Sequence, residues 1–149
     1  MHQIVYYSRL NKTAVNGSTL SLLREIVDVS QRNNARDDIT GALIFDNEWF
    51  LQILEGPAEA IDRTYHRIQK DPRHDLVTLV ERRTATNRLF PEWGMGGTIR
   101  SMDVQEIFLD HGIAGAIEPA RLPASTIVSL ALDLKRYELG RKRARGAAA

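Results

Sequence analysis

One glutamine in this chain stands where a strand would normally bury an apolar side chain. Residues 50–57 read FLQILEGP, a strand-like run that ends in a turn, and Gln52 lies between large apolar neighbours. An amide side chain both donates and accepts hydrogen bonds, and a buried amide without partners costs about 1–3 kcal/mol. Gln52 is therefore either exposed on an edge strand or bonded to a polar partner inside the protein.

The residue types that carry most enzyme chemistry form no recognisable motif. Cysteine is absent, which excludes disulfides, thiolate metal sites, cysteine nucleophiles and photochemistry through a cysteinyl adduct. The 4 histidines are scattered without carboxylates at metal-ligand spacing. The serines lie in no nucleophile-elbow pattern, and Gly94, Gly96 and Gly97 lack the strand–turn–helix context of a phosphate loop. The sequence therefore predicts neither an enzyme nor a metal site.

Composition indicates one globular domain with a charged tail. The chain has 149 residues, of which 43% are apolar and 26% charged. No apolar run reaches the roughly 18 residues of a membrane span and no leader segment is recognisable, so we expect a cytoplasmic protein. Four of the 20 basic residues lie in 141–149, and without them 16 basic residues face 19 acidic ones. Nucleic acid is thus a disfavoured partner, and residues 141–149 are expected to form a disordered basic tail.

Hydrophobic spacing predicts alternating strands and helices. Ser18 or Thr19 offers a helix N-cap, Asp46-Asn47 suits a two-residue hairpin turn, and Asp71-Pro72 ends a helix. The expected elements, in order, are a strand at 4–8, a loop at 10–17, a helix at 20–32, strands at 39–45 and 48–54, a helix at 58–70, a strand at 76–82 and a fifth strand at 93–99. The order β-α-β-β-α-β is the ferredoxin-like arrangement of the α+β class.

Two further helices are expected after the sheet, at 103–109 and 123–139. The second carries an apolar stripe, which must pack on the sheet or on another subunit to leave water. Its members are Ile127, Leu130, Ala131 and Leu134. We therefore expect one main domain over residues 1–100, a helical extension over 101–140 and the tail over 141–149.

Five sequence blocks together resemble one family. Residues 40–57, TGALIFDNEWFLQILEGP, resemble the core signature of BLUF domains, which sense blue light with a flavin. The other blocks, in the same order as in that family, are Tyr6-Tyr7-Ser8, SQRNN at 30–34, DPRH at 71–74 and FPEWGM at 90–95. The match spans residues 4–95, and the joint occurrence of the blocks is far more specific than any one of them. The chain is similar to the short, single-domain members of the family.

The resemblance implies a flavin held between the two helices on one face of the sheet, FAD or alternatively FMN. Tyr6 and Gln52 would then lie beside the N5 and C4-carbonyl edge of the flavin, Asn34 near C4 and N3, and Arg73 near the C2 carbonyl. The other implied flavin contacts are Ile26, Ser30, Asn33, Leu43, Phe50, Asp71 and His74. Trp93 and Met95 would be a switching pair on the last strand, and which of them faces the flavin stays open.

The resemblance also implies a mechanism and a kind of output. In the family, light drives electron and proton transfer from the tyrosine to the flavin, after which the glutamine rearranges and the absorption shifts slightly to the red. An amide that rotates or tautomerises presents a different atom to the ring, which makes Gln52 a two-state element. The short chain implies a separate effector protein, such as an enzyme of cyclic-nucleotide signalling, and a homo-oligomer. The rival expectation is a ferredoxin-like small-molecule or oligomerisation module without photochemistry.

Overall fold

The computed structural model describes residues 1–14 and 17–148. Two residues of the expected 10–17 loop, Val15 and Asn16, and the last residue of the expected tail, Ala149, lie outside the described residues. Of the helices in the described part, none combines the length and apolar character that a bilayer span requires.

Within these residues, five strands form one sheet in the order β4-β1-β3-β2-β5. The strands are β1 (His2–Leu10), β2 (Thr40–Asp46), β3 (Trp49–Gly56), β4 (His74–Thr84) and β5 (Gly96–Ile99). All neighbours pair antiparallel except β2 and β5, which pair parallel. The α+β, ferredoxin-like fold expected from the sequence is confirmed, with the fifth strand added at the edge beside β2.

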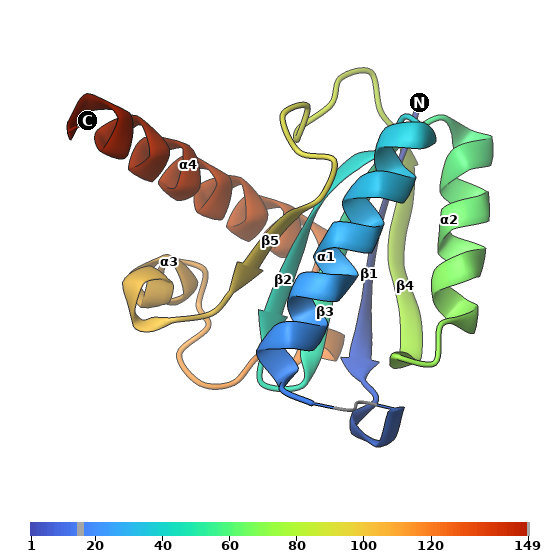
Figure 1. Cartoon of the computed structure of the whole chain (residues 1–149), viewed down its shortest axis with the longest axis horizontal. Coiled ribbons are helices and arrows are strands. Elements are labelled where there is room, and N and C mark those ends of the chain that lie inside the picture. The colour runs from blue at the N-terminus through green and yellow to red at the C-terminus, as the bar shows by residue number, and fades with distance from the viewer. Residues whose placement is uncertain (15–16, 149) are drawn as a thin grey trace.

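Two helices cover one face of the sheet, as Figure 1 shows for α1 (Thr19–Arg36) and α2 (Ala58–Lys70). Helix α1 begins where the sequence predicts, because the Ser18 hydroxyl caps it by accepting a hydrogen bond of 3.1 Å from the Ser21 backbone N–H. Beneath the two helices lies a core of buried apolar side chains. Its members are Ile4, Tyr6, Leu10, Leu23, Ile26, Ile39, Leu43, Phe45, Phe50, Leu54, Ala60, Ile61 and Met95.

The opposite face is covered by α3 (Gln105–Asp110) and the N-terminal half of α4 (Ala124–Ala148), which crosses behind the sheet in Figure 1. The apolar stripe predicted for α4 is at most 1% exposed at each of its four positions, so it packs on the sheet. Each face of the sheet has its own core, because successive side chains of a strand point to opposite faces. Phe50 and Leu54 of β3 point to the α1 and α2 side, and Leu51 and Ile53 point to the α4 side.

The basic segment that we expected to be disordered is instead helical. Helix α4 does not stop at residue 139 but continues to Ala148, because arginine, lysine and alanine are strong helix formers. Residues 140–146 are nevertheless all exposed to solvent. In Figure 1 this C-terminal half of α4 extends beyond β5 and away from the sheet.

Element boundaries differ from the predicted ones at the sheet edges. Strand β5 begins at Gly96 and not at residue 93, and α3 is a short helix preceded by a 3₁₀ turn at Met102–Val104. The β2–β3 turn comprises Asn47 and Glu48, with Asn47 at φ 62°, so the predicted turn was one residue early. Asp46 instead belongs to β2 and pairs with Trp49, and its carboxylate accepts from the Arg100 guanidinium at 2.8 Å and from the Ile117 backbone N–H at 3.1 Å.

Candidate functional site

The predicted site residues meet between α1, α2 and the centre of the sheet. Gln52 lies opposite Tyr6 of β1 and opposite Leu43 of β2 in the strand register. Beside Gln52 is a small cavity of about 70 Å³. It is lined by Val29, Ser30, Asn33, Asn34, Gln52, Leu54, Thr64, Arg67, Ile68, Asp71, Arg73 and Met95.

Three polar atoms at this place are buried without a hydrogen-bond partner among the described residues: Tyr6 Oη, Gln52 Oε1 and Thr64 Oγ1. Each such group costs about 1–3 kcal/mol of stability, and native proteins contain few of them. Burial raises the pKa of Tyr6 well above its usual value, and the nearby Tyr65 raises it further, so the phenol is neutral at pH 7. This donor and acceptor set fits a ligand whose edge both donates and accepts hydrogen bonds, as a flavin ring does.

A charged group closes the cavity on the α2 side. The Arg73 guanidinium donates to both Asp71 carboxylate oxygens at 2.6–3.0 Å and lies 3.8 Å from Glu25 of α1. Burial alone would raise the pKa of Asp71, but the hydrogen bonds and charge of Arg73 outweigh it and the pKa is lowered. The pair therefore stays ionised at neutral pH, and Arg73 lines the cavity with guanidinium N–H groups, which are donors of the kind that bind oxygen acceptors.

Two side chains near the end of α1 form hydrogen bonds to the segment before β5. The Asn34 side-chain amide donates to the Gly94 carbonyl at 2.8 Å, and the Gln31 amide donates to the Met95 carbonyl at 3.0 Å. Asn34 is not a helix cap, because the helix continues to Arg36 and its C-cap is Asp37, whose backbone N–H donates to the Asn33 carbonyl. Asn34 is 2% exposed and fixed in orientation beside the cavity.

The two predicted switch residues lie on opposite faces of the sheet. Met95 is 2% exposed, lines the cavity with Gln52 and belongs to the core under α1 and α2. Trp93 packs against the core under α4, with its ring 6.1 Å from that of Phe90 at an interplanar angle of 18°. In this structure Met95 therefore occupies the cavity side and Trp93 the α4 side.

Five of the predicted contacts are near the cavity without lining it. Tyr6, Ile26, Leu43 and Phe50 belong to the apolar core under α1 and α2. His74 is buried behind them, 3.1 Å from the Ser8 hydroxyl through Nδ1, with its ring 4.9 Å from Phe50. Ligand pockets usually measure about 300–1,000 Å³, so this cavity of about 70 Å³ is smaller than the usual pocket for a ligand with a tricyclic ring.

Several lining residues were not predicted. They are Val29, Leu54, Thr64, Arg67 and Ile68. Two signals were available for them in the sequence: Leu54 follows Gln52 by two residues and shares its strand face, and Thr64 and Ile68 continue the buried face of the second helix from Ile61.

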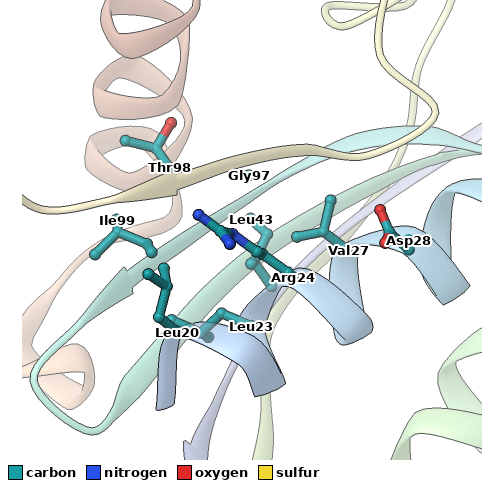
Figure 2. Close-up of a pocket in the computed structure, with 9 residues that line it drawn as sticks. All are labelled: Leu20, Leu23, Arg24, Val27, Asp28, Leu43, Gly97, Thr98 and Ile99. Carbon is teal, nitrogen blue, oxygen red and sulfur yellow. The ribbon is translucent and has the colours of Figure 1, made fainter. Parts of the chain in front are cut away.

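A wider groove of about 310 Å³ lies between α1 and β5. Figure 2 shows its lining, which is Leu20, Leu23, Arg24, Val27, Asp28, Leu43, Gly97, Thr98 and Ile99. Although the groove is larger, none of the buried polar atoms without partners in the described residues belongs to it. We therefore place the candidate site in the smaller, polar cavity.

Comparisons with known proteins identify the family. The family described as BLUF, sensors of blue-light using FAD, matches residues 1–96. The photoactivated adenylate cyclase subunit beta of Euglena gracilis is 40% identical over 81 residues, which are 54% of this chain and 9% of that one. The blue light- and temperature-regulated antirepressor BluF of Escherichia coli (strain K12) is 37% identical over 73 residues, 49% of this chain and 18% of that one.

Among solved structures, BlsA in its photo-activated state matches with a TM-score of 0.78 and 26% identity, covering 89% of this chain and 93% of that one. The chain thus corresponds to a small part of the two longer relatives and to nearly all of BlsA. The match over residues 1–96 includes the cavity and both photoactive candidates on β1 and β3. The chain belongs to the BLUF family, the sensors of blue light that use FAD.

Proposed function

We propose that Tyr6 and Gln52 form the photoactive pair of this blue-light sensor, at the cavity between α1, α2 and the sheet. The observation that supports this most directly is that Tyr6 Oη and Gln52 Oε1 are buried and without partners on directly opposed positions of neighbouring strands. Two such groups side by side cost stability unless a ligand bonds to them. They are the two groups that a flavin edge would satisfy.

Each residue has a distinct role in the proposed mechanism. Bound flavin supplies absorption of blue light and the capacity to accept an electron. Tyr6 holds its phenolic proton in the dark, because burial raises its pKa, and it would be the residue that supplies an electron and that proton to a bound flavin. Gln52 then presents the other end of its amide to the ring edge, which changes the hydrogen bonds that the edge accepts.

The remaining cavity residues position the ring. Asn34 of α1 and Arg73, which follows α2, both line the cavity and would supply N–H donors to ring carbonyls. We assign flavin contacts also to Ile26, Ser30, Asn33, Leu43, Phe50, Asp71 and His74. FAD is the flavin that the family uses, and FMN is the alternative in the same place.

The experiment is a set of absorption spectra in darkness and under blue light, for the wild type and three variants. Gln52→Leu and Tyr6→Phe should bind flavin but lose the small red shift that reverses in darkness. Tyr7→Phe is the matched control, because Tyr7 is the next residue of β1 and packs on the opposite face against Trp49. Normal photocycles in both cavity variants would refute the assignment. A colourless wild type that takes up no flavin would return the chain to the rival module without photochemistry, which its family membership disfavours.

We also propose that residues 1–100 are the sensor and that the helices after them signal to a separate effector protein, in the cytoplasm and as a homo-oligomer. The names of the two longer relatives, an adenylate cyclase and an antirepressor, support an effector such as an enzyme of cyclic-nucleotide signalling. The exposed half of α4 supports a surface for it. Size-exclusion profiles and effector capture that are identical in darkness and light would contradict this part.

A further inference from the structure

We propose that Lys135 of α4 is a positioning residue that couples the segment carrying Trp93 and Met95 to the C-terminal helix. The proposal rests on the proposed function, because it concerns how a change at the cavity reaches α4. The segment meant here is residues 89–95, called the switch segment below.

On the α4 side, the polar contact is made through a single ammonium group, beside the apolar packing of Phe90 and Trp93. Lys135 Nζ donates to the Leu89 carbonyl at 2.7 Å and pairs with the Glu92 carboxylate at 2.8 Å. The same ammonium lies 5.7 Å from the centre of the Phe90 ring, within cation–π range. Among the hydrogen bonds and ion pairs of the described residues, Lys135 is the α4 side chain that reaches the switch segment.

On the sheet side, the switch segment is held by the Glu55 carboxylate of β3. Glu55 is fully buried and accepts from the Phe90 backbone N–H at 2.6 Å and the Leu89 backbone N–H at 2.9 Å. Lys135 contacts both of these residues as well as Glu92. The start of the segment is thus fixed between β3, which carries Gln52, and α4.

On the cavity side, the end of the segment is held by α1. The Gly94 and Met95 carbonyls accept from Asn34 and Gln31. The switch segment therefore contacts the cavity at one end and Lys135 at the other. A change at Gln52 or Met95 that moves the segment must either carry Lys135 with it or break its contacts.

Breaking those contacts has a clear physical consequence. The Lys135 side chain is 14% exposed, so water replaces few of the bonds that it would lose. Its neighbour Arg136 is 75% exposed and pairs with Asp133 on the same helix. Lys135 therefore transmits the state of the switch segment to α4, and Arg136 does not.

The test is amide hydrogen exchange of α4 in darkness and under blue light, measured on the flavin-loaded full chain. The variants are Lys135→Met, Lys135→Arg and Arg136→Met, each with its flavin spectrum recorded in parallel. We expect all of them to keep the red shift. The light-minus-dark difference in α4 should be present in the wild type, in Arg136→Met and in Lys135→Arg, whose guanidinium preserves the charge and the donors. It should be lost in Lys135→Met.

Each alternative outcome decides the question. A light-minus-dark difference in Lys135→Met equal to that of the wild type overturns the proposal, as does its loss in Arg136→Met too. If Lys135 had only a structural role, Lys135→Met would change the amide hydrogen exchange of α4 equally in darkness and in light. If Lys135→Met does not fold, Glu92→Gln removes one partner at a side chain that is 47% exposed, and an unchanged difference there overturns the proposal.

Measurements on the wild-type protein distinguish a failure of this proposal from a failure of the proposed function. A wild type without any red shift refutes the photoactive assignment itself. A wild type that shifts normally but shows no light-dependent exchange in α4 refutes the role of Lys135 alone.

Discussion

Replacing Glu55 by glutamine is expected to destabilise the protein by about 2–3 kcal/mol, although the two side chains have nearly the same shape. Glu55 is buried and accepts three hydrogen bonds: from Leu89, from Phe90 and from the Thr40 hydroxyl at 2.9 Å. A glutamine oxygen can keep the Phe90 and Thr40 bonds, but its amide nitrogen then faces the Leu89 N–H, donor against donor. A hydrogen bond to a charged group contributes about 1.5–3 kcal/mol, and a buried N–H left unpaired costs about 1–3 kcal/mol.

The assay is equilibrium unfolding in urea. Domains of this size are stable by about 5–15 kcal/mol, and with a slope of about 1–3 kcal/mol per molar urea the midpoint should fall by roughly 1–2 M. Glu81→Gln is the matched control, because Glu81 is exposed on β4 and exposed substitutions usually change stability by less than about 0.5 kcal/mol. A Glu55→Gln midpoint indistinguishable from that of the control would show that Glu55 does not hold the switch segment.

Two other perturbations test separate parts of the structure. Gly96→Ala should displace the Trp93 indole, on which an added Cβ would impinge, at a cost of about 1–3 kcal/mol; the measurement is the Trp93 emission in a Trp49→Phe background, and unchanged emission would contradict the packing. Burial lowers the pKa of His74, although Asp71 partly opposes this. The unfolded chain, with a histidine pKa of about 6.5, therefore binds more protons, and stability should fall as the pH drops below that value. In His74→Gln, the urea midpoint should depend less on pH between about pH 7 and 5 than it does in the wild type. An equal pH dependence of the midpoint in both proteins would rule out His74 as the titrating group.

The elements that were predicted well are those that local chemistry determines. Helix α2 has the predicted bounds because Pro57 precedes it and Asp71-Pro72 ends it. The face of Gln52 follows from the two-residue period of a strand. What local patterns do not contain is the partner of each side chain at long range. Asp46 looks like a turn residue until Arg100 and Ile117 are seen to occupy its carboxylate.

The candidate site, like the fold, could be predicted from the sequence only in part. The polar residues near the cavity were found because five sequence blocks resemble a family, and the unusual position of the Gln52 amide was visible from its apolar neighbours alone. The side of the sheet that Trp93 occupies was not predictable, because it depends on Phe90 and on the bare backbone of Gly96, which leaves space for the indole. The link through Lys135 joins positions 43 residues or more apart in sequence, and no periodicity reports such a pair.

The continuity of α4 has a consequence for anything joined to its end. The helix runs from beneath the sheet to Ala148, and each residue of an α-helix advances about 1.5 Å and rotates about 100°. A reporter fused by prolonging α4 would be held at an azimuth decided by the number of residues inserted. One extra residue would point it elsewhere, and seven would return it to within about 20° of the first orientation. Light control of such a fusion should rise and fall with linker length, with the period of the helix.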